Sequence, residues 1–146
     1  MNDAIDQFRL VAENFSGTVN GNISAYMLGG ILCQQGRYDE AITWYESVDK
    51  GTKAGFVGAQ AYEGLATCYE LKKDTAKALS YLEKALKDER LTYRHGALRW
   101  KAALLYRATD TTKAIALCDA IISDTLASTQ HQNAAYLKGL LNGKTE

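Results

Sequence analysis

The chain lacks the features that mark a disulfide framework, a membrane span or a strongly charged surface. It has no proline, and its three cysteines are far apart and never form a C-x-x-C pair, which argues against a disulfide framework and a zinc site. No run of about 18 apolar residues is present, so no membrane-spanning helix is expected. Seventeen basic residues balance seventeen acidic ones, so no overall field draws the chain to nucleic acid or to an anionic membrane surface. We expect free cysteines, no nucleic-acid partner and no direct membrane contact.

Motifs of catalysis and metal binding are also missing. There is no Gly-rich phosphate loop, no G-x-S-x-G, no H-E-x-x-H and no calcium loop. Glu63 and Glu70 are seven residues apart, which on a helix places them on one face about 10 Å from each other. That separation permits paired-carboxylate chemistry, but nothing else in the sequence supports it, and two solvated acids are the simpler interpretation. We predict no catalytic residue, no metal, no cofactor and no enzymatic activity.

The sequence does contain four copies of one apolar helical pattern. In YDEAITWYESVDK, the residues Ala41, Tyr45 and Val48 are spaced i, i+4 and i+7, so they share one face of a helix. Residues of similar size and polarity occur 37 residues before each of these three positions, 37 residues after them, and a further 36 residues on. These equivalents are Ala4, Phe8 and Val11, then Ala78, Leu82 and Ala85, then Ala114, Cys118 and Ile121. Repeated helices of this kind bury their apolar faces by stacking on their neighbours.

A second family of helices alternates with the first. One of its positions carries a Gly or Ala that permits close approach of two backbones, namely Gly29, Ala66, Ala103 and Gly139. The turns between the two families carry Asp39, Asp74 and Asp110. We expect the side chains of these aspartates to accept hydrogen bonds from exposed N–H groups at the start of the next helix.

The combined pattern L-G-x-x-x-x-x-x-G-x-Y-x-x-A-x-x-x-Y resembles the tetratricopeptide repeat (TPR), whose usual period is about 34 residues. It is carried by Leu28, Gly29, Gly36, Tyr38, Ala41 and Tyr45, and again by Leu65, Ala66, Tyr69, Ala78 and Ala85. The longer period predicts slightly longer linkers or helices, and the absence of proline removes the residue that usually closes each unit. The resemblance implies an all-α fold, a right-handed α-solenoid of antiparallel helix pairs with about seven helices.

The repeat boundaries predict one domain over residues 1–146. It would comprise a half unit at 1–15, units at about 22–52, 59–89 and 95–125, and a terminal helix at about 128–142.

In proteins that resemble this family, the first helix of each pair presents a stripe of residues to a concave groove. Large aromatic side chains in such a groove favour peptide recognition, because they desolvate well and lose little side-chain entropy. The alternative for Trp100 and Tyr136 is packing against a neighbouring helix. The expected partner-binding residues are Tyr26, Gly30, Gln34, Glu63, Thr67, Glu70, Trp100, Leu104, Arg107 and Tyr136. Tyr26, Gly30 and Glu63 cannot form the Lys and Asn clamp with which similar repeats hold acidic chaperone tails.

The sequence therefore predicts a non-catalytic protein–protein interaction module, a scaffold that binds a peptide or helix of a partner protein in its concave groove. The alternative is a structural or assembly element, a fragment of a longer and membrane-anchored bacterial envelope protein that packs through its edges or self-associates as a homo-oligomer. A chain that begins inside a repeat, at NDAIDQF, suggests such a fragment. The stretch MNDAIDQF lacks the charged and apolar regions of a signal peptide, so the chain as written is expected to be cytoplasmic; the alternative is a soluble domain of a membrane-anchored or periplasmic protein whose N-terminus is missing.

Overall fold

The protein is built from α-helices joined by short links. A computed structural model describes residues 2–51 and 54–143, which form eight α-helices and the 3-10 helices η2 and η3, with no strand in those ranges. The α-helices are α1 (Asn2–Asn14), α2 (Val19–Gln34), α3 (Tyr38–Ser47), α4 (Gly55–Leu71), α5 (Thr75–Lys87), α6 (His95–Tyr106), α7 (Thr111–Ser123) and α8 (His131–Asn142), with η2 at Glu89–Arg94 and η3 at Thr125–Gln130. The predicted all-α class is confirmed, with eight helices where about seven were expected. None of the described helices has the length and apolar character to cross a membrane.

The helices are distributed over two compact units, residues 1–85 and 86–146. The first unit holds α1 to α4 and most of α5, and the second holds α6 to α8 with the two 3-10 helices. The single domain expected over the whole chain stays a prediction.

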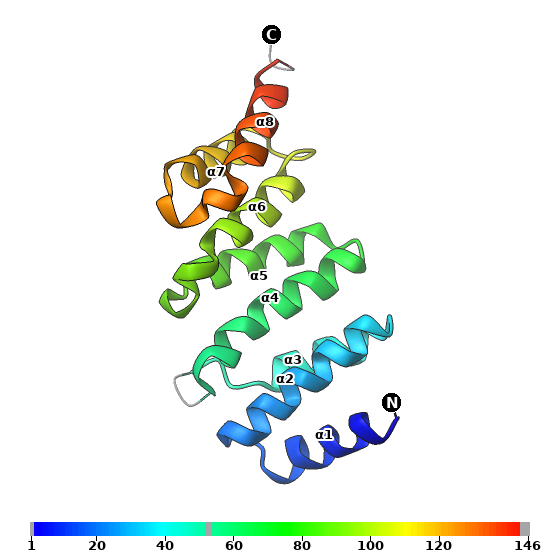
Figure 1. The fold of residues 1–146 in the computed structure, drawn as a ribbon. Helices are drawn as coiled ribbons and strands as arrows, with labels where there is room; N and C mark the ends of the chain where they lie inside the picture. Colours follow the sequence, from blue (N-terminus) through cyan, green and yellow to red (C-terminus); the bar gives the residue numbers. More distant parts are fainter. Residues whose placement is uncertain (1, 52–53, 144–146) are drawn as a thin grey trace. The chain divides into compact units, whose positions relative to one another are not determined.

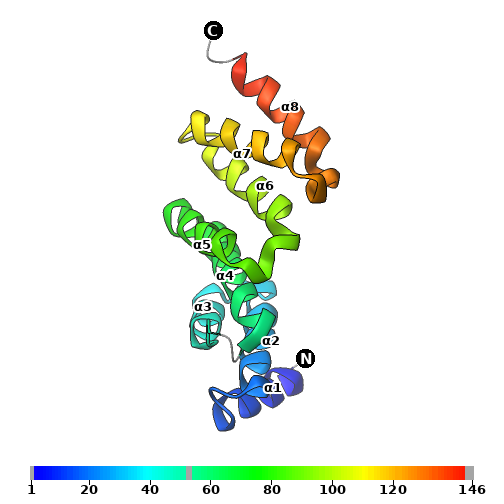
Figure 2. The same ribbon diagram turned by 90° about the vertical axis from the view of Figure 1, so that its left-hand side faces the viewer.

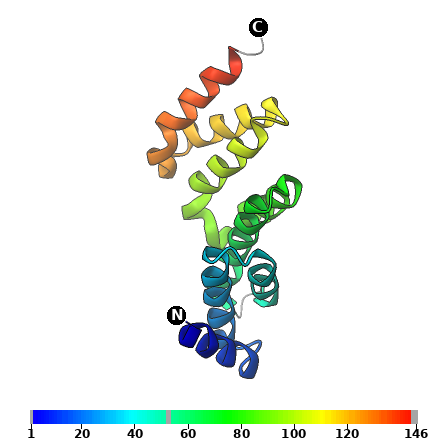
Figure 3. The same cartoon turned by 90° about the vertical axis from the view of Figure 1, so that its right-hand side faces the viewer.

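In the first unit, helices that follow one another in the chain pack side by side. α1 packs on α2, α2 on α3 and α3 on α4, and α2 also contacts α4 (Figures 1 and 3). Leu28 and Leu32 of α2 are fully buried in the shared core, as is Val48 beyond the end of α3. Complete burial of a side chain of this size contributes about 1.5–3 kcal/mol, so this core fixes how α2 lies against its neighbours.

Helix α2 carries the site described below, and local hydrogen bonds set both of its ends. At its start, the Thr18 side chain accepts from the backbone N–H of Gly21 at 3.1 Å. At its end, Gly36 takes a φ of +76°, the left-handed conformation that glycine adopts without strain. The Arg37 N–H then donates back to the Leu32 carbonyl at 2.9 Å, which closes a Schellman motif. The short link into α3 follows directly from this geometry.

In the second unit, α6 packs on α7 and α7 packs on α8 (Figure 2). Cys118 and Ile121 of α7 are fully buried, and Leu137 and Leu141 of α8 lie in the same core. Trp100 of α6 is half-buried and packs against this core from the side.

Two of the three predicted aspartate caps are present. Asp74 accepts from the Lys77 N–H at 3.1 Å and Asp110 accepts from the Lys113 N–H at 3.0 Å. Asp39 was predicted wrongly: it lies inside α3, and its carboxylate pairs with the Lys72 ammonium. The reason is register, because Asp74 and Asp110 stand four residues before the repeated alanine of their helices and Asp39 stands only two before its own.

The cap assignment predicts a difference between two aspartate variants. We expect Asp110→Ala to lower the free energy of unfolding by about 1 kcal/mol, because α7 loses the acceptor for an exposed N–H. The matched variant Asp39→Ala removes only an exposed ion pair with Lys72 and should cost less than about 0.5 kcal/mol. Urea denaturation followed by circular dichroism measures both, and equal losses would contradict the cap at Asp110.

The repeated alanine position is buried in three helices and exposed in the fourth. Ala41, Ala78 and Ala114 are each 0% exposed, as the repeat pattern predicts. Ala4 of α1 is exposed, and Phe8 of the same helix is only half-buried, so the expectation of an equivalent burial there is wrong. The physical reason is that α3 packs between α2 and α4, where the Tyr45 ring meets Gly29 and Gly64, whereas α1 packs on α2.

Candidate functional site

A pocket of about 260 Å³ opens beside α2. Its lining consists of Tyr26, Met27, Gly30, Ile31 and Gln34 of α2 together with Tyr45 of α3. Three of the ten residues predicted from the sequence, Tyr26, Gly30 and Gln34, therefore line one pocket, because a spacing of four residues places them on one stripe of the helix.

The wall of this pocket is the ring of Tyr45, which lies in a slot made by glycines of two helices. A Cβ atom at Gly29 of α2 would lie 2.9 Å from the Tyr45 Cδ1, and one at Gly64 of α4 would lie 2.5 Å from its Cζ. Tyr26 meets the same ring edge to face, with 5.7 Å between centroids and 61° between planes. A larger residue at either glycine would displace the ring, so the two glycines determine where it lies.

The chemistry of the pocket is that of a neutral, partly apolar cavity. Burial raises the pKa of Tyr45 well above its usual range, and the neighbouring Tyr26 and the carboxylate of Glu63 raise it further. The phenol therefore stays protonated at neutral pH. Gly30 leaves space in the pocket, since an added Cβ there would meet only the Tyr45 hydroxyl oxygen, at 3.6 Å. The rim carries the exposed amide of Gln34.

The predicted acidic residues lie on α4, the helix beside α2, and outside the lining of this pocket. Glu63 is half-buried and close enough to Tyr45 to affect the pKa of its phenol, whereas Glu70 is exposed. The Thr67 hydroxyl donates to the Glu63 carbonyl of its own helix at 3.0 Å. Glu63 thus provides a negative charge next to the pocket.

The remaining predicted residues belong to the second unit. Trp100 packs against the core of that unit, as one of the two sequence interpretations expected, and Leu104 is partly exposed on the same helix. Arg107 is the C-cap residue of α6 and is exposed. Tyr136 on α8 is 71% exposed, so core packing does not account for it.

Sequence reasoning missed three lining residues, Met27, Ile31 and Tyr45. Tyr45 was assigned to the buried face of its helix, and it is indeed only 6% exposed. A buried ring can still form the wall of a pocket when the facing position is a glycine, and the pairing of Tyr45 with Gly29 in the repeat pattern is the signal that could have shown this.

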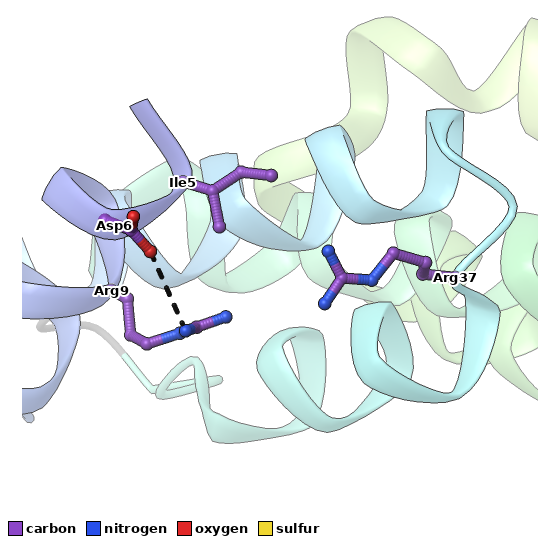
Figure 4. Close-up of a pocket in the computed structure, with 4 residues that line it drawn as sticks. All are labelled: Ile5, Asp6, Arg9 and Arg37. Atoms are coloured by element: carbon purple, nitrogen blue, oxygen red, sulfur yellow. Dashed lines mark ion pairs between the residues drawn. The ribbon is translucent and has the colours of Figure 1, made fainter. Parts of the chain in front are cut away.

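A second pocket of about 270 Å³ lies at α1 and the link between α2 and α3. The guanidinium groups of Arg9 and Arg37 point toward each other across it, with Asp6 and Ile5 on the α1 side (Figure 4). Arg9 pairs with Asp6 at 3.8 Å, and Arg37 donates two hydrogen bonds to Glu40, each 2.7 Å long, which lowers the pKa of that carboxyl. Each of the two guanidinium groups already has a carboxylate partner, so the α2 pocket is the stronger candidate.

The three cysteines carry free thiols. Cys33 of α2 and Cys68 of α4 are nevertheless neighbours, because the packing of the two helices brings them together. Burial, followed by a hydrogen bond with Cys33, raises the pKa of the Cys68 thiol to about 12, so this thiol is a poor nucleophile. Within the described ranges, no cluster of three or more His, Cys, Asp or Glu residues could hold a metal ion.

Comparison with protein-family models gives matches described as tetratricopeptide repeat. One model matches residues 2–55 and 74–131, and another matches residues 59–87. Comparison with curated proteins and with solved structures finds no match. The matched segments cover most of the chain and include every helix pair of the two units up to the start of α8.

Proposed function

From the premise that this chain belongs to the tetratricopeptide repeat family, we propose that it binds a segment of a partner protein at the α2 pocket. Tetratricopeptide repeats generally mediate protein–protein interaction and are typically non-catalytic scaffolds. Their stacked helix pairs imply a helical solenoid.

The observation that supports the proposal most strongly is the pocket itself. It is about 260 Å³ in volume, it is lined by aromatic and aliphatic side chains, and Gly30 keeps its floor open. Such a cavity fits one apolar side chain of a peptide, and burial of one anchor of this kind can supply much of the binding energy. The partner segment is thus expected to carry a Leu, Ile, Met or Phe.

The charges on α4 support a second element of recognition. Glu63 is half-buried beside the pocket wall and Glu70 follows seven residues later on the same helix. A Lys or Arg of the partner, placed near its apolar anchor, would meet these carboxylates and steer association. Trp100, Leu104, Arg107 and Tyr136 are proposed as further contacts on the second unit.

Filling the pocket should weaken this recognition. We expect Gly30→Leu to weaken binding of selected peptides at least about tenfold, because the added side chain takes the place of the anchor, a loss typical of a hot spot. The probe is a displayed library of random linear peptides selected on the wild-type chain, and calorimetric titration of the enriched peptides measures the affinities. Ser80→Leu adds the same side chain at an exposed position of α5 and should bind as the wild type does.

Two results would contradict the proposal. One is a set of enriched peptides with no common apolar and basic residue, and the other is equal binding by folded Gly30→Leu and wild type. Circular dichroism on each variant shows whether the helices are intact.

A further inference from the structure

Helix α8 presents a face that is covered in every earlier helix of its type. Ala66 and Ala103 are buried at the repeated small position, and Gly29 is contacted there by the ring of Tyr45. At the equivalent Gly139, an added Cβ would have no atom within 4 Å. Tyr136, on the same side of α8, is 71% exposed.

Helix α1 presents the matching face of the other helix type. In α3 this face consists of Ala41, Tyr45 and Val48, which are 0%, 6% and 2% exposed, and the Tyr45 ring lies between Gly29 of α2 and Gly64 of α4. The equivalent residues of α1 are Ala4, Phe8 and Val11. Here the alanine is exposed and the two larger side chains are only half-buried. α1 packs on α2 and Phe8 reaches the core of the first unit, but the exposed Ala4 shows that this face of α1 is only partly covered in the described residues.

We propose that α1 of one copy of this chain docks on α8 of a second copy. The contact between α2 and α3 is the template, since the two uncovered helices repeat its pattern at equivalent positions. Phe8 would lie over Gly139 as Tyr45 lies over Gly29, and Ala4 would allow the two backbones to approach closely. The docked pair would complete one helical repeat between two molecules. The proposal goes beyond peptide recognition at the α2 pocket, which lies elsewhere on the chain.

The charges of the two helices favour the same pairing. α1 carries Asp3, Asp6 and Glu13 against the single Arg9. α8 carries no carboxylate, and its Lys138 pairs with Asp119 of α7 at 2.6 Å. An acidic helix thus meets a helix without negative side chains, which avoids like-charge repulsion and favours this partner over a second α1.

This contact joins two different surfaces, so it is heterologous. A copy that docks through its α1 still presents its own α8, so association of this kind continues into rings or open chains rather than stopping at a symmetric dimer. This distinguishes it from self-association through a single patch.

The test uses two variants that block opposite ends. Gly139→Arg fills the open face of α8 and Ala4→Arg blocks α1, and both positions are exposed, so neither substitution disturbs the fold of the single molecule. Ala116→Arg, at an exposed position of α7, is the matched control. Sedimentation velocity at protein concentrations from about 1 µM to about 1 mM detects self-association with a Kd in that range.

The wild type and Ala116→Arg are expected to grow with concentration beyond twice the 16.0 kDa mass of one chain. Each end variant alone should stay a monomer. An equimolar mixture of Gly139→Arg and Ala4→Arg should form dimers and nothing larger, because one free α8 meets one free α1. A wild type that stays monomeric throughout, or association that survives Gly139→Arg, would overturn the proposal.

Discussion

Tyr45→Ala is expected to lower the free energy of unfolding by about 3–5 kcal/mol, the usual cost of removing a buried aromatic ring. The ring is 6% exposed and fills a slot between Gly29 of α2 and Gly64 of α4. Gly29 and Gly64 have no side chains that could fill this space, so truncation of Tyr45 leaves a cavity. Urea denaturation followed by circular dichroism measures the loss.

The matched variant Tyr45→Phe keeps the ring and removes only the hydroxyl. It should cost about 1 kcal/mol or less, because the ring that fills the slot is kept. The same two variants separate packing from recognition, because Tyr45 also forms the wall of the α2 pocket. Peptides selected on the wild type should bind Tyr45→Phe and lose binding to any folded fraction of Tyr45→Ala. Similar unfolding midpoints for Tyr45→Ala and Tyr45→Phe would contradict the conclusion that the Tyr45 ring fills this slot.

Ala41→Leu is the second substitution with a large expected effect. Ala41 is completely buried at the close contact of α3 with α2, and three added carbon atoms have no space there. Overpacking of this kind costs about 1–3 kcal/mol, because it moves backbones or forces strained side-chain rotamers. The measurement is again the free energy of unfolding, at a concentration of about 1 µM so that any weak self-association is negligible.

Ala4→Leu is the control, since Ala4 occupies the same repeat position on α1 and is exposed. We expect its free energy of unfolding to stay within about 0.5 kcal/mol of the wild type, as for most surface substitutions. If Ala41→Leu were equally harmless, the assigned repeat register would be wrong. A large loss in Ala4→Leu would instead show that this face of α1 is covered within the single molecule.

Periodicity carried most of the fold prediction. The spacing of Ala41, Ala78 and Ala114 identified the buried contacts of three helices, because a 36–37 residue repeat places each alanine against an equivalent neighbour. The same periodicity failed at Ala4, where burial depends on a neighbouring helix that the repeat position alone does not guarantee. The cap predicted at Asp39 was wrong for a related reason. The N-cap of α3 is Arg37, two residues before Asp39, and local composition does not fix such a boundary.

The candidate site was only partly predictable. Tyr26, Gly30 and Gln34 were found because a spacing of four residues defines a stripe on one helix. Tyr45 was missed as a lining residue because its contribution depends on α2, α3 and α4 meeting at two glycines. The nearness of Cys33 and Cys68 likewise follows from packing of α2 on α4 and not from their separation of 35 residues in the chain.

The sequence by itself determined the helical class, the repeat and the faces that must be buried, because these follow from local spacing and the need to cover apolar side chains. Only the tertiary structure decided which of the equivalent faces find a partner. Gly29 and Gly139 share one repeat position, yet one holds a tyrosine ring and the other faces open space. A side chain is buried only when a second surface covers it, and the sequence pattern of one helix does not specify which helix packs on it.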